Sequence, residues 1–430
     1  MNIRFSLNLI GIFLMFLGGL MLLPVVCSFL YHEDDHYSIV ISAAITFLSG
    51  FILWYFSKAP KKIEEIERKD AFLIAALFWF TAGIFGSLPY LLYGVFSNPA
   101  DGIFESVSGF TTTGASAISN IEVIPHGILF WRNLTQWLGG MGIIVLAIAV
   151  LPKLSVGGMQ LMRLEAPGPT TEKITPQIAV TAKKLWTVYI ILSVALTIIL
   201  IFGGMSFYDS IMHTLSTMST GGFSPKNASI AAYNSSFIDV VLTVFMFLAG
   251  ANFILHYSVF TGNFKSILKS TEFRFYLLLN LFFTLLIALQ INKSFYGSFV
   301  EALRFASFQV ISISTTTGFA TADFDLWPSF SKFILLTLMF IGGCSGSTSG
   351  AVKVIRFLIL FKKAYQKLEK LIYPKIVSPI RLEGKIVDED VASDIASFFL
   401  LYILIAVFST MVFLLVENVD ILTGLSAVAT

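Results

Sequence analysis

Long apolar segments alternate along the chain with short polar ones. The first two apolar runs, 5–30 and 38–57, are separated by the polar turn 31–36. Further runs follow at about 71–94, 127–150, 185–204, 237–259, 275–291, 331–350 and 395–416. A helix needs about 20 mainly apolar residues to cross the hydrocarbon core of a bilayer, so the runs are of membrane-spanning length. This pattern predicts an all-α membrane protein.

The first run is longer than the apolar core of a secretory signal peptide, which has about 7–15 residues. It follows one basic residue, Arg4, and its Val25-Val26-Cys27 segment is a poor lipoprotein box. We therefore expect a retained membrane helix.

Three polar segments that end in glycine lie between apolar runs. They are Ser108–Ser116, which contains three threonines before Gly114, Ser219–Ser224 around Gly222, and Ser314–Ala320 around Gly318. The second segment has Gly221 where the other two have threonine. The final glycines fall 108 and 96 residues apart. Similar segments at a fairly regular spacing indicate an internal repeat.

A Thr-x-Gly loop has a specific use inside a membrane. Glycine permits backbone dihedrals that turn successive carbonyls the same way, and a ring of carbonyls can replace the water around a potassium ion. An ordinary turn between two helices is the alternative, but three matching copies favour a selectivity filter. The candidate ion-binding residues are Thr111, Thr112, Thr113, Gly114, Thr220, Gly221, Gly222, Thr316, Thr317 and Gly318.

Each loop has the same context: a span, a short amphipathic helix, the glycine loop and a second span. A helix of about ten residues is too short to cross the membrane, and irregular backbone at that depth must line a cavity or be buried in protein. We predict two N-terminal spans followed by tandem span–pore helix–span repeats around one central pore. The predicted divisions are 1–69 (two spans and a linker), 70–152 (repeat 1), 153–264 (linker and repeat 2), 265–356 (repeat 3), 357–394 (cytoplasmic linker) and 395–430 (start of repeat 4). We expect the fourth filter loop and its closing helix to lie beyond residue 430.

Each predicted pore helix opens with an acidic residue: Asp101, Asp209 or Glu301. A carboxylate at a helix N-terminus interacts favourably with the positive end of the macrodipole. The same geometry would point the negative end at the ion. Simple capping at the membrane surface is the alternative explanation for these side chains.

Composition supports membrane insertion and argues against catalysis. The chain is 56% hydrophobic and 13% charged, with a mean hydropathy of +0.83, whereas soluble domains carry about 25% charged residues. The two cysteines, Cys27 and Cys344, suggest no disulfide framework, and the five histidines show no ligand spacing. We expect no bound cofactor and no metal site other than a potassium site at the filter. A membrane-bound enzyme would need clustered intramembrane carboxylates, histidines or a nucleophile motif, which the sequence does not show.

Basic residues give an orientation. Twenty-three of the 28 Lys and Arg residues fall at Arg4 and within 58–69, 153–184, 265–274 and 353–385. The predicted topology puts all of these on one side, which the positive-inside rule makes cytoplasmic. The N-terminus is then cytoplasmic and the filter loops open outward. The basic segment 353–385 and the linker 152–182 are also candidate docking sites for a cytosolic partner.

The most unusual membrane segment is a candidate gate. The segment Ile341–Gly350 has four glycines and four hydroxyl residues among its ten positions. Each glycine destabilises a helix by roughly 1 kcal/mol relative to alanine. We expect residues 344–349 to leave helical geometry and to cross the pore below the filter. Close packing of small residues is the alternative, and we favour it for the milder segments 139–142 and 249–252. The candidate gate residues are Gly342, Gly343, Cys344, Ser345, Gly346, Ser347, Thr348, Ser349 and Gly350.

Together these motifs resemble a known family. The three glycine loops, the segment Trp131–Gly142 (WRNLTQWLGGMG) and the gate segment are similar to the TrkH-like members of the Trk/Ktr/HKT superfamily, the Trk-type potassium uptake proteins of bacteria. The resemblance covers essentially the whole chain. It implies four span–pore–span units around one pore, potassium as the substrate, homodimers in the bacterial inner membrane, and a gate in the third closing helix. It also implies a cytosolic NAD/ATP-binding regulatory subunit.

Two alternatives stay open within this class. A sodium-coupled or less selective monovalent cation transporter would share the architecture. A serine in place of Gly114 would have favoured this alternative, so the glycine favours potassium. The sequence also leaves open whether uptake is channel-like or coupled to protons or sodium.

Overall fold

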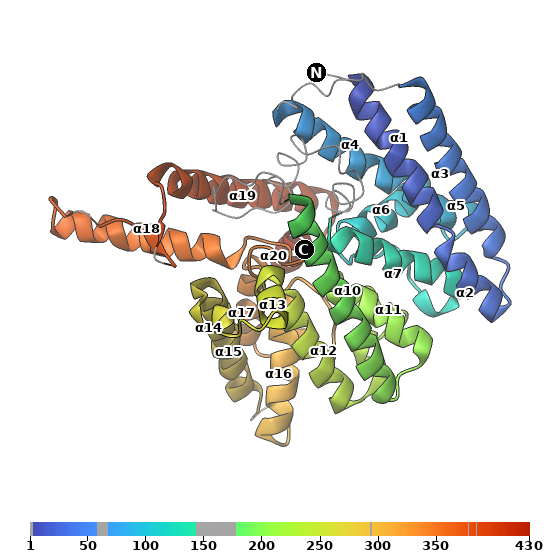
Figure 1. Ribbon diagram of the computed structural model, residues 1–430. Coiled ribbons are helices and arrows are strands. Elements are labelled where there is room, and N and C mark those ends of the chain that lie inside the picture. The colour runs from blue at the N-terminus through green and yellow to red at the C-terminus, as the bar shows by residue number, and fades with distance from the viewer. Residues whose placement is uncertain (1–2, 58–67, 143–177, 293–294, 377, 384) are drawn as a thin grey trace. The chain divides into compact units, whose positions relative to one another are not determined.

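The computed structural model describes residues 3–57, 68–142, 178–292, 295–376, 378–383 and 385–430. Almost all of its regular structure is helical (Figure 1). The described residues form two compact units, one up to Val241 and one from Leu242 onward, and helix α12 (Ser236–Ala249) carries the boundary.

The first unit begins with two apolar helical runs. Helices α1 (Ile3–Leu20) and α2 (Leu23–Tyr31) make up the first run, and a proline at the start of α2 accompanies the break between them. The second run is α3 (His36–Phe56). A Cβ atom on Gly11 would lie 2.7 Å from the Gly50 carbonyl oxygen, so glycines let the backbones of α1 and α3 approach closely.

The rest of the first unit holds two of the glycine loops. It contains α4 (Arg68–Gly86), α5 (Leu88–Tyr93), α6 (Pro99–Phe110), the 3-10 helix η1 (Ile121–Val123), α7 (His126–Gly140), α10 (Ile178–Phe202), α11 (Phe207–Met218) and the 3-10 helix η2 (Ser229–Tyr233). The short helices α6 and α11 each end at a glycine loop, as predicted. Residues 143–150 of the predicted first closing span lie outside the described residues.

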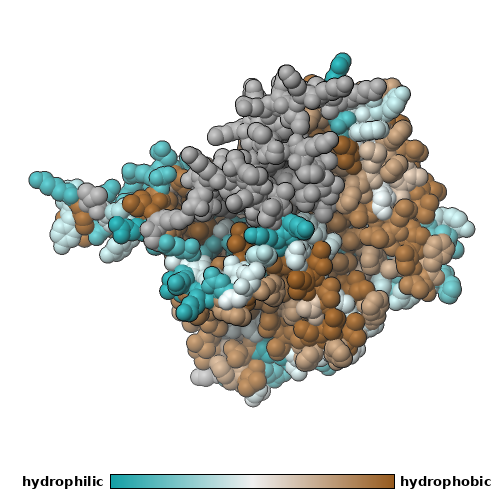
Figure 2. All heavy atoms as spheres, viewed as in Figure 1, coloured by the Kyte–Doolittle hydropathy of each residue, from teal (hydrophilic) through white to brown (hydrophobic). Residues whose placement is uncertain are grey.

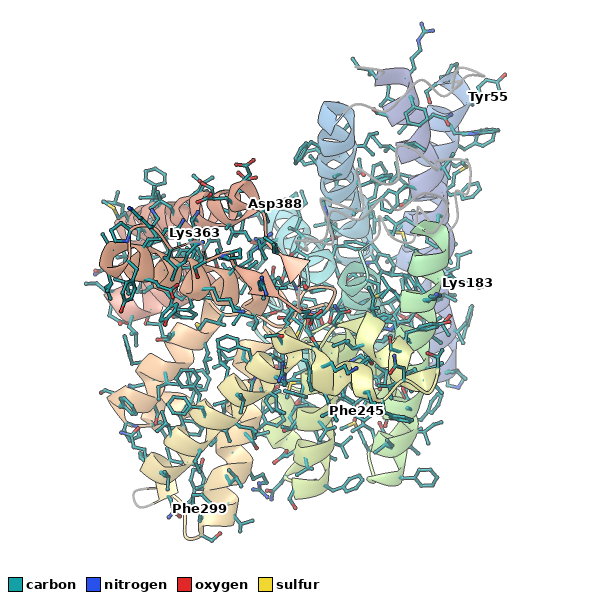
Figure 3. The ribbon with its side chains drawn as sticks, turned by 60° about the vertical axis from the view of Figure 1, so that its left-hand side comes forward. Tyr55, Lys183, Phe245, Phe299, Lys363 and Asp388 are labelled. Atoms are coloured by element: carbon teal, nitrogen blue, oxygen red, sulfur yellow. The ribbon has the colours of Figure 1, made fainter. Side chains whose placement is uncertain are left out.

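The second unit holds the third loop and the candidate gate. Its elements are α13 (Phe253–Phe260), α14 (Lys265–Lys269), α15 (Thr271–Asn292), α16 (Phe299–Ser314), the 3-10 helix η3 (Phe324–Leu326), α17 (Ser329–Met339), α18 (Val354–Ile372), the hairpin strands β1 (Arg381–Leu382) and β2 (Lys385–Ile386), α19 (Glu389–Val416) and α20 (Ile421–Ala429). Within this unit, Phe299 lies at the end opposite to Lys363 and Asp388 (Figure 3).

The three short helices begin with the caps that their sequences encode. The side chains of Asn98, Ser206 and Ser298 accept hydrogen bonds from backbone N–H groups in the first turns of α6, α11 and α16. Asp101, Asp209 and Glu301 lie in the same first turns. Side-chain caps and the helix dipole therefore act together at these ends.

Six described helical segments are long and apolar enough to cross a membrane, or seven if the bent pair α12–α13 counts as one span. Large hydrophobic side chains stay exposed along them, including Leu48 on α3 and Leu278 on α15. Hydrophobic residues also form broad surface areas over the N-terminal helices (Figure 2). Exposed apolar surface on this scale faces lipid in a membrane protein. The chain is a multi-pass membrane protein.

One predicted span is wrong and another is broken as expected. Residues 237–259 were predicted to form one closing helix, but α12 and α13 meet at a bend of 102°. Helix α17 ends at Met339, and residues 344–349 are not helical, which confirms the predicted break. Gly250 packs closely against Tyr276 and Thr315, as favoured for segment 249–252, but the same segment also contains the bend, which was not expected.

Candidate functional site

The three glycine loops have the same backbone conformation. In each loop a threonine adopts a left-handed φ of 55–58°, and the glycine two residues later adopts a φ of 77–83°. The left-handed pairs are Thr112 with Gly114, Thr220 with Gly222, and Thr316 with Gly318. The residue between each pair donates its N–H to the carbonyl oxygen of a serine five residues earlier: Ser108, Ser216 or Ser312. A left-handed β-branched residue is an outlier, and such outliers cluster at functional sites.

This conformation leaves loop carbonyls unpaired. Among the described residues, none donates a hydrogen bond to the carbonyl oxygens of Thr112, Gly114, Thr220, Gly222, Thr316 or Gly318. Apart from Thr220, these residues are partly or fully exposed, so an ion can reach them. Free carbonyls at the end of a short helix are a candidate cation site.

The first and third loops hold themselves together. Ser108 donates its hydroxyl to the Ala115 carbonyl at 2.5 Å, and Ser312 donates to the Phe319 carbonyl at 2.7 Å. The hydroxyls of the first and third threonines also pair, at 2.8 Å in the first loop and 2.7 Å in the third. Both loops thus close through their own side chains.

The second loop is held from outside by α7. Asn133 donates its Nδ2 group to the Ser216 hydroxyl at 2.7 Å and to the Phe223 carbonyl at 3.0 Å. Gln136 donates its Nε2 group to the Gly221 carbonyl at 2.6 Å and accepts the Phe223 N–H at 3.0 Å. Of the three carbonyls expected to bind the ion in this loop, that of Gly221 therefore has a protein partner.

A buried ion pair supports the same region. Arg132 donates Nε–H to the Glu105 carboxylate at 2.6 Å, and both side chains are at most 1% exposed. Glu105 also accepts hydrogen bonds from the Ser116 hydroxyl and the Ala117 N–H, just after the first loop. The Arg132 guanidinium lies 3.4 Å from the centroid of the Phe223 ring, so one ion pair reaches both loops.

The first two loops lie next to each other within the first unit. A Cβ atom on Gly114 would lie 2.2 Å from the Gly221 carbonyl oxygen. Any side chain at position 114 would collide with backbone. Close approach therefore requires glycine there, in addition to its left-handed φ.

The contact between a closing helix and the next loop recurs in both units. In the first, Gly140 packs against Ser219, and Tyr189 donates its hydroxyl to the Trp137 carbonyl at 3.0 Å. In the second, Gly250 packs against Thr315, and Tyr276 donates to the Phe247 carbonyl at 3.2 Å. The same pairs of rings are stacked in both places. The repeat seen in sequence thus extends to the joints between neighbouring elements.

The candidate gate segment is an ordered, hydrogen-bonded loop. Gly343 donates its N–H to the Ser349 hydroxyl at 2.8 Å, and the Ser347 hydroxyl donates to the Cys344 carbonyl at 2.6 Å. Glu272 on α15 accepts the N–H and the hydroxyl of Ser345. The buried Lys353 ammonium donates to the carbonyls of Ser347 and Ser349. Hydroxyls and two charged groups satisfy a backbone that has left helical geometry.

This segment contacts both the third loop and the α12–α13 bend. Gly350 donates its N–H to the Thr316 hydroxyl at 2.7 Å. At the bend, Cys344 donates its N–H to the Gly250 carbonyl at 2.8 Å, and Phe253 donates its N–H to the Gly346 carbonyl at 3.0 Å. The broken ends of two helices therefore supply each other's missing backbone partners.

The acidic turn 31–36 anchors the start of α7. Glu33 accepts the N–H of His126 at 2.7 Å, and Asp35 accepts the N–H of Ile128 at 3.0 Å. Burial raises the pKa of Asp35, and the nearby Glu33 carboxylate adds to this shift. The turn therefore also caps the helix that holds the second loop.

Several residues of the site were not predicted as functional: Ser108, Ser216, Ser312, Glu105, Arg132, Asn133, Gln136, Glu272 and Lys353. A signal existed for those on α7, because Arg132, Asn133 and Gln136 interrupt a helix of membrane depth, where polar residues are rare and functional. Within the described part of the chain, no group of three His, Cys, Asp or Glu residues could hold a metal ion.

The long apolar helices define a multi-pass membrane protein. The chain belongs to the TrkH family of cation transport proteins, whose family model matches residues 35–430. This is a family of transporters, so the protein is a transporter rather than an enzyme.

Characterised relatives cover the whole chain. It is 37% identical over 431 residues to the Trk system potassium uptake protein TrkH of Halomonas elongata, a match that takes in 100% of this chain and 89% of the relative. It is 37% identical over 440 residues to TrkH of Escherichia coli K12, with the same coverage of both chains. The crystal structure of the potassium transporter TrkH from Vibrio parahaemolyticus superposes with a TM-score of 0.89 at 36% identity, over 100% of this chain and 89% of that one.

Proposed function

We propose that this protein takes up potassium across the bacterial inner membrane through a filter lined by the backbone carbonyls of its glycine loops. The observation that carries the proposal is the shared left-handed conformation of Thr112, Thr220 and Thr316, each followed two residues later by a left-handed glycine. This geometry frees carbonyl oxygens that can replace the hydration shell of the ion. The naming of the relatives as potassium uptake proteins supports the choice of ion.

The filter would combine one loop from each of four repeats. Helices α4–α7, α10–α12 and α15–α17 would supply three span–pore helix–span units, and α19 with α20 would begin a fourth. These units would occupy the predicted divisions 70–152, 153–264, 265–356 and 395–430. The N-terminus and the basic segments would be cytoplasmic, and two chains would pair as a homodimer.

Segment Gly342–Gly350 would be the gate. Its contacts with Thr316 and with the α12–α13 bend support this role, because they connect a non-helical segment to a filter loop. Glycine tolerates more than one backbone state, so the segment can move aside without a large rearrangement of helices. Membrane potential would drive entry, at about 2.3 kcal/mol per charge per 100 mV.

A cytosolic nucleotide-binding regulator would control the gate through α18. This helix directly follows the gate and combines Lys363 and Lys367 with the exposed Phe361 and Tyr365. Changing Lys362, Lys363 and Lys367 to Glu should abolish capture of the regulator in a pull-down. Lys226→Glu, on the side predicted to be external, is the matched control. Retained capture by the triple variant would exclude this surface.

Rubidium uptake by the full-length protein in proteoliposomes tests the function. We expect excess potassium to block rubidium uptake, and the same concentration of sodium to have little effect. Gly318→Ser should reduce this discrimination, because a side chain in a left-handed position disturbs the carbonyls. Equal competition by sodium in the wild type would instead favour the less selective or sodium-coupled alternative.

A further inference from the structure

Glycine at position 221 has no backbone explanation. The first and third loops have Thr113 and Thr317 at this position, and their hydroxyls pair within the loop. Gly221 is not among the residues with a positive φ. A threonine could therefore adopt its backbone conformation, and the reason for glycine must lie in the surroundings.

The space beside Gly221 is filled by Gln136. A Cβ atom on Gly221 would lie 2.4 Å from Cδ, 2.6 Å from Nε2 and 2.7 Å from Oε1 of Gln136, and these are its three nearest atoms. Real Cβ atoms essentially never approach other atoms so closely. Gln136 is also fully buried. The glutamine and the glycine are therefore sterically coupled.

Gln136 fixes the orientation of two consecutive peptide groups. Its Nε2 group binds the carbonyl of Gly221, and its Oε1 atom binds the N–H of Phe223. Across a trans peptide, the carbonyl points opposite to the N–H. Because the Phe223 N–H points at Gln136, the carbonyl of Gly222 points away from α7.

In the second unit, different residues occupy the positions that correspond to Gln136 and Gly221. Gln136 lies four residues before Gly140, and the residue four before Gly250 is Met246. The loop that packs on Gly250 has Thr317 where the second loop has Gly221. The chain thus has glutamine and glycine at these two positions in the first unit, and methionine and threonine at the corresponding positions in the second.

We propose that Gln136 is a positioning residue that determines ion specificity at the second loop. Its amide replaces the threonine hydroxyl that braces the other loops, turns the Gly221 carbonyl toward α7 and presents the Gly222 carbonyl to the ion. This inference rests on the proposed potassium filter. It assigns to Gly222, rather than Gly221, the carbonyl that discriminates potassium from sodium.

The test compares four variants of the full-length protein by rubidium uptake into proteoliposomes, with sodium and potassium as competitors. Gln136→Met should lower potassium-over-sodium discrimination by about tenfold, the effect of losing the hydrogen bonds that orient a buried group. Gly221→Thr should impair uptake through steric collision. The double variant should recover discrimination, because it rebuilds the Met246–Thr317 arrangement. Gln290→Met, which removes the hydrogen bond that a half-buried glutamine accepts from the Ser331 hydroxyl away from the loops, should leave discrimination unchanged.

Recovery by the double variant separates positioning from general stability, because two destabilising changes would otherwise add. If Gln136→Met does not fold, Gln136→Glu keeps the acceptor for Phe223 and loses the donor to Gly221, so discrimination should fall again. If the wild type prefers potassium and the Gln136 variants keep that preference, the inference about Gln136 is wrong but the proposed function stands. A wild type without potassium preference would overturn the proposed function as well.

Discussion

The second glycine loop, Ser219–Gly222, and the third, Thr315–Gly318, follow the same backbone path, yet different partners hold them in place. Asn133 and Gln136 on α7 hold the second loop from outside. The third loop closes through its own serine and threonine hydroxyls. The two loops thus share a backbone conformation, but different side-chain hydrogen bonds stabilise it.

The two loops also differ in the segments that they contact. The second loop depends on a helix that contains a buried ion pair and is capped by the acidic turn. The third loop instead contacts the gate segment, through Thr316 and Gly350. We infer that the second loop is the rigid part of the filter and that the third is the part that the gate can reach.

The largest expected effect comes from breaking the ion pair behind the second loop. Arg132→Leu leaves the Glu105 carboxylate buried without its counter-charge, which costs about 3–5 kcal/mol. We expect a large loss of folded protein or a strongly lowered Tm in detergent. The position eight residues before Gly250 holds a buried leucine, Leu242, so an apolar residue fits at the corresponding place in the second unit.

Adding Glu105→Gln to Arg132→Leu is the control, because it removes the uncompensated charge. The double variant should regain part of the lost stability. If Arg132→Leu alone were as stable as the wild type, the ion pair would not support the loops.

The next largest effect distinguishes Gly114 from Gly318, which share a left-handed φ. Alanine at either position costs roughly 1–2 kcal/mol in backbone strain. Gly114→Ala also drives a methyl group into the Gly221 carbonyl oxygen, whereas nothing lies within 4 Å of a Cβ atom on Gly318. Rubidium uptake should therefore be nearly abolished by Gly114→Ala and only reduced by Gly318→Ala. Equal losses would show that contact between the first two loops is unimportant.

A smaller effect is expected at the gate beside the third loop. Glu272→Ala removes both hydrogen bonds that the carboxylate accepts from Ser345. Bonds to a charged group contribute about 1.5–3 kcal/mol, so unregulated rubidium uptake should rise by about tenfold or more. Glu389→Ala, at the exposed start of α19, should leave the flux unchanged. Unaltered flux in Glu272→Ala would mean that this carboxylate does not hold the gate.

The smallest effect compares equivalent serines. Ser312→Ala removes the hydrogen bond that the Ser312 hydroxyl donates to the Phe319 carbonyl, at a cost of about 1 kcal/mol. Ser216→Ala should cost less, because Asn133 still binds the carbonyls of Met212 and Phe223. Thermal unfolding of both variants in detergent measures the difference. A larger loss for Ser216→Ala would contradict external bracing of the second loop.

Local sequence signals predicted the helices and loops well. Apolar length indicated most of the spans, and the acidic residues Asp101, Asp209 and Glu301 marked the first turns of the short helices. The Thr-Gly motifs marked three loops that share one conformation. The glycines at 342–350 gave the break after α17. In each case the deciding physics is local to the residues concerned.

Features that depend on tertiary partners were not predictable in this way. The bend after Gly250 is one such feature, because its freed carbonyl is bound by the N–H of Cys344, which is distant in the sequence. Likewise, Gly221 is explained only by Gln136, which lies 85 residues away in the chain.

The central claim is that carbonyls of the three loops bind a dehydrated potassium ion. Anomalous X-ray scattering from crystals of the full-length protein grown in rubidium tests this directly. We predict an anomalous peak within coordination distance of the carbonyl oxygens of Thr112, Thr220 and Thr316 that disappears when sodium replaces rubidium. A rubidium peak elsewhere, or none at these loops, would contradict the account.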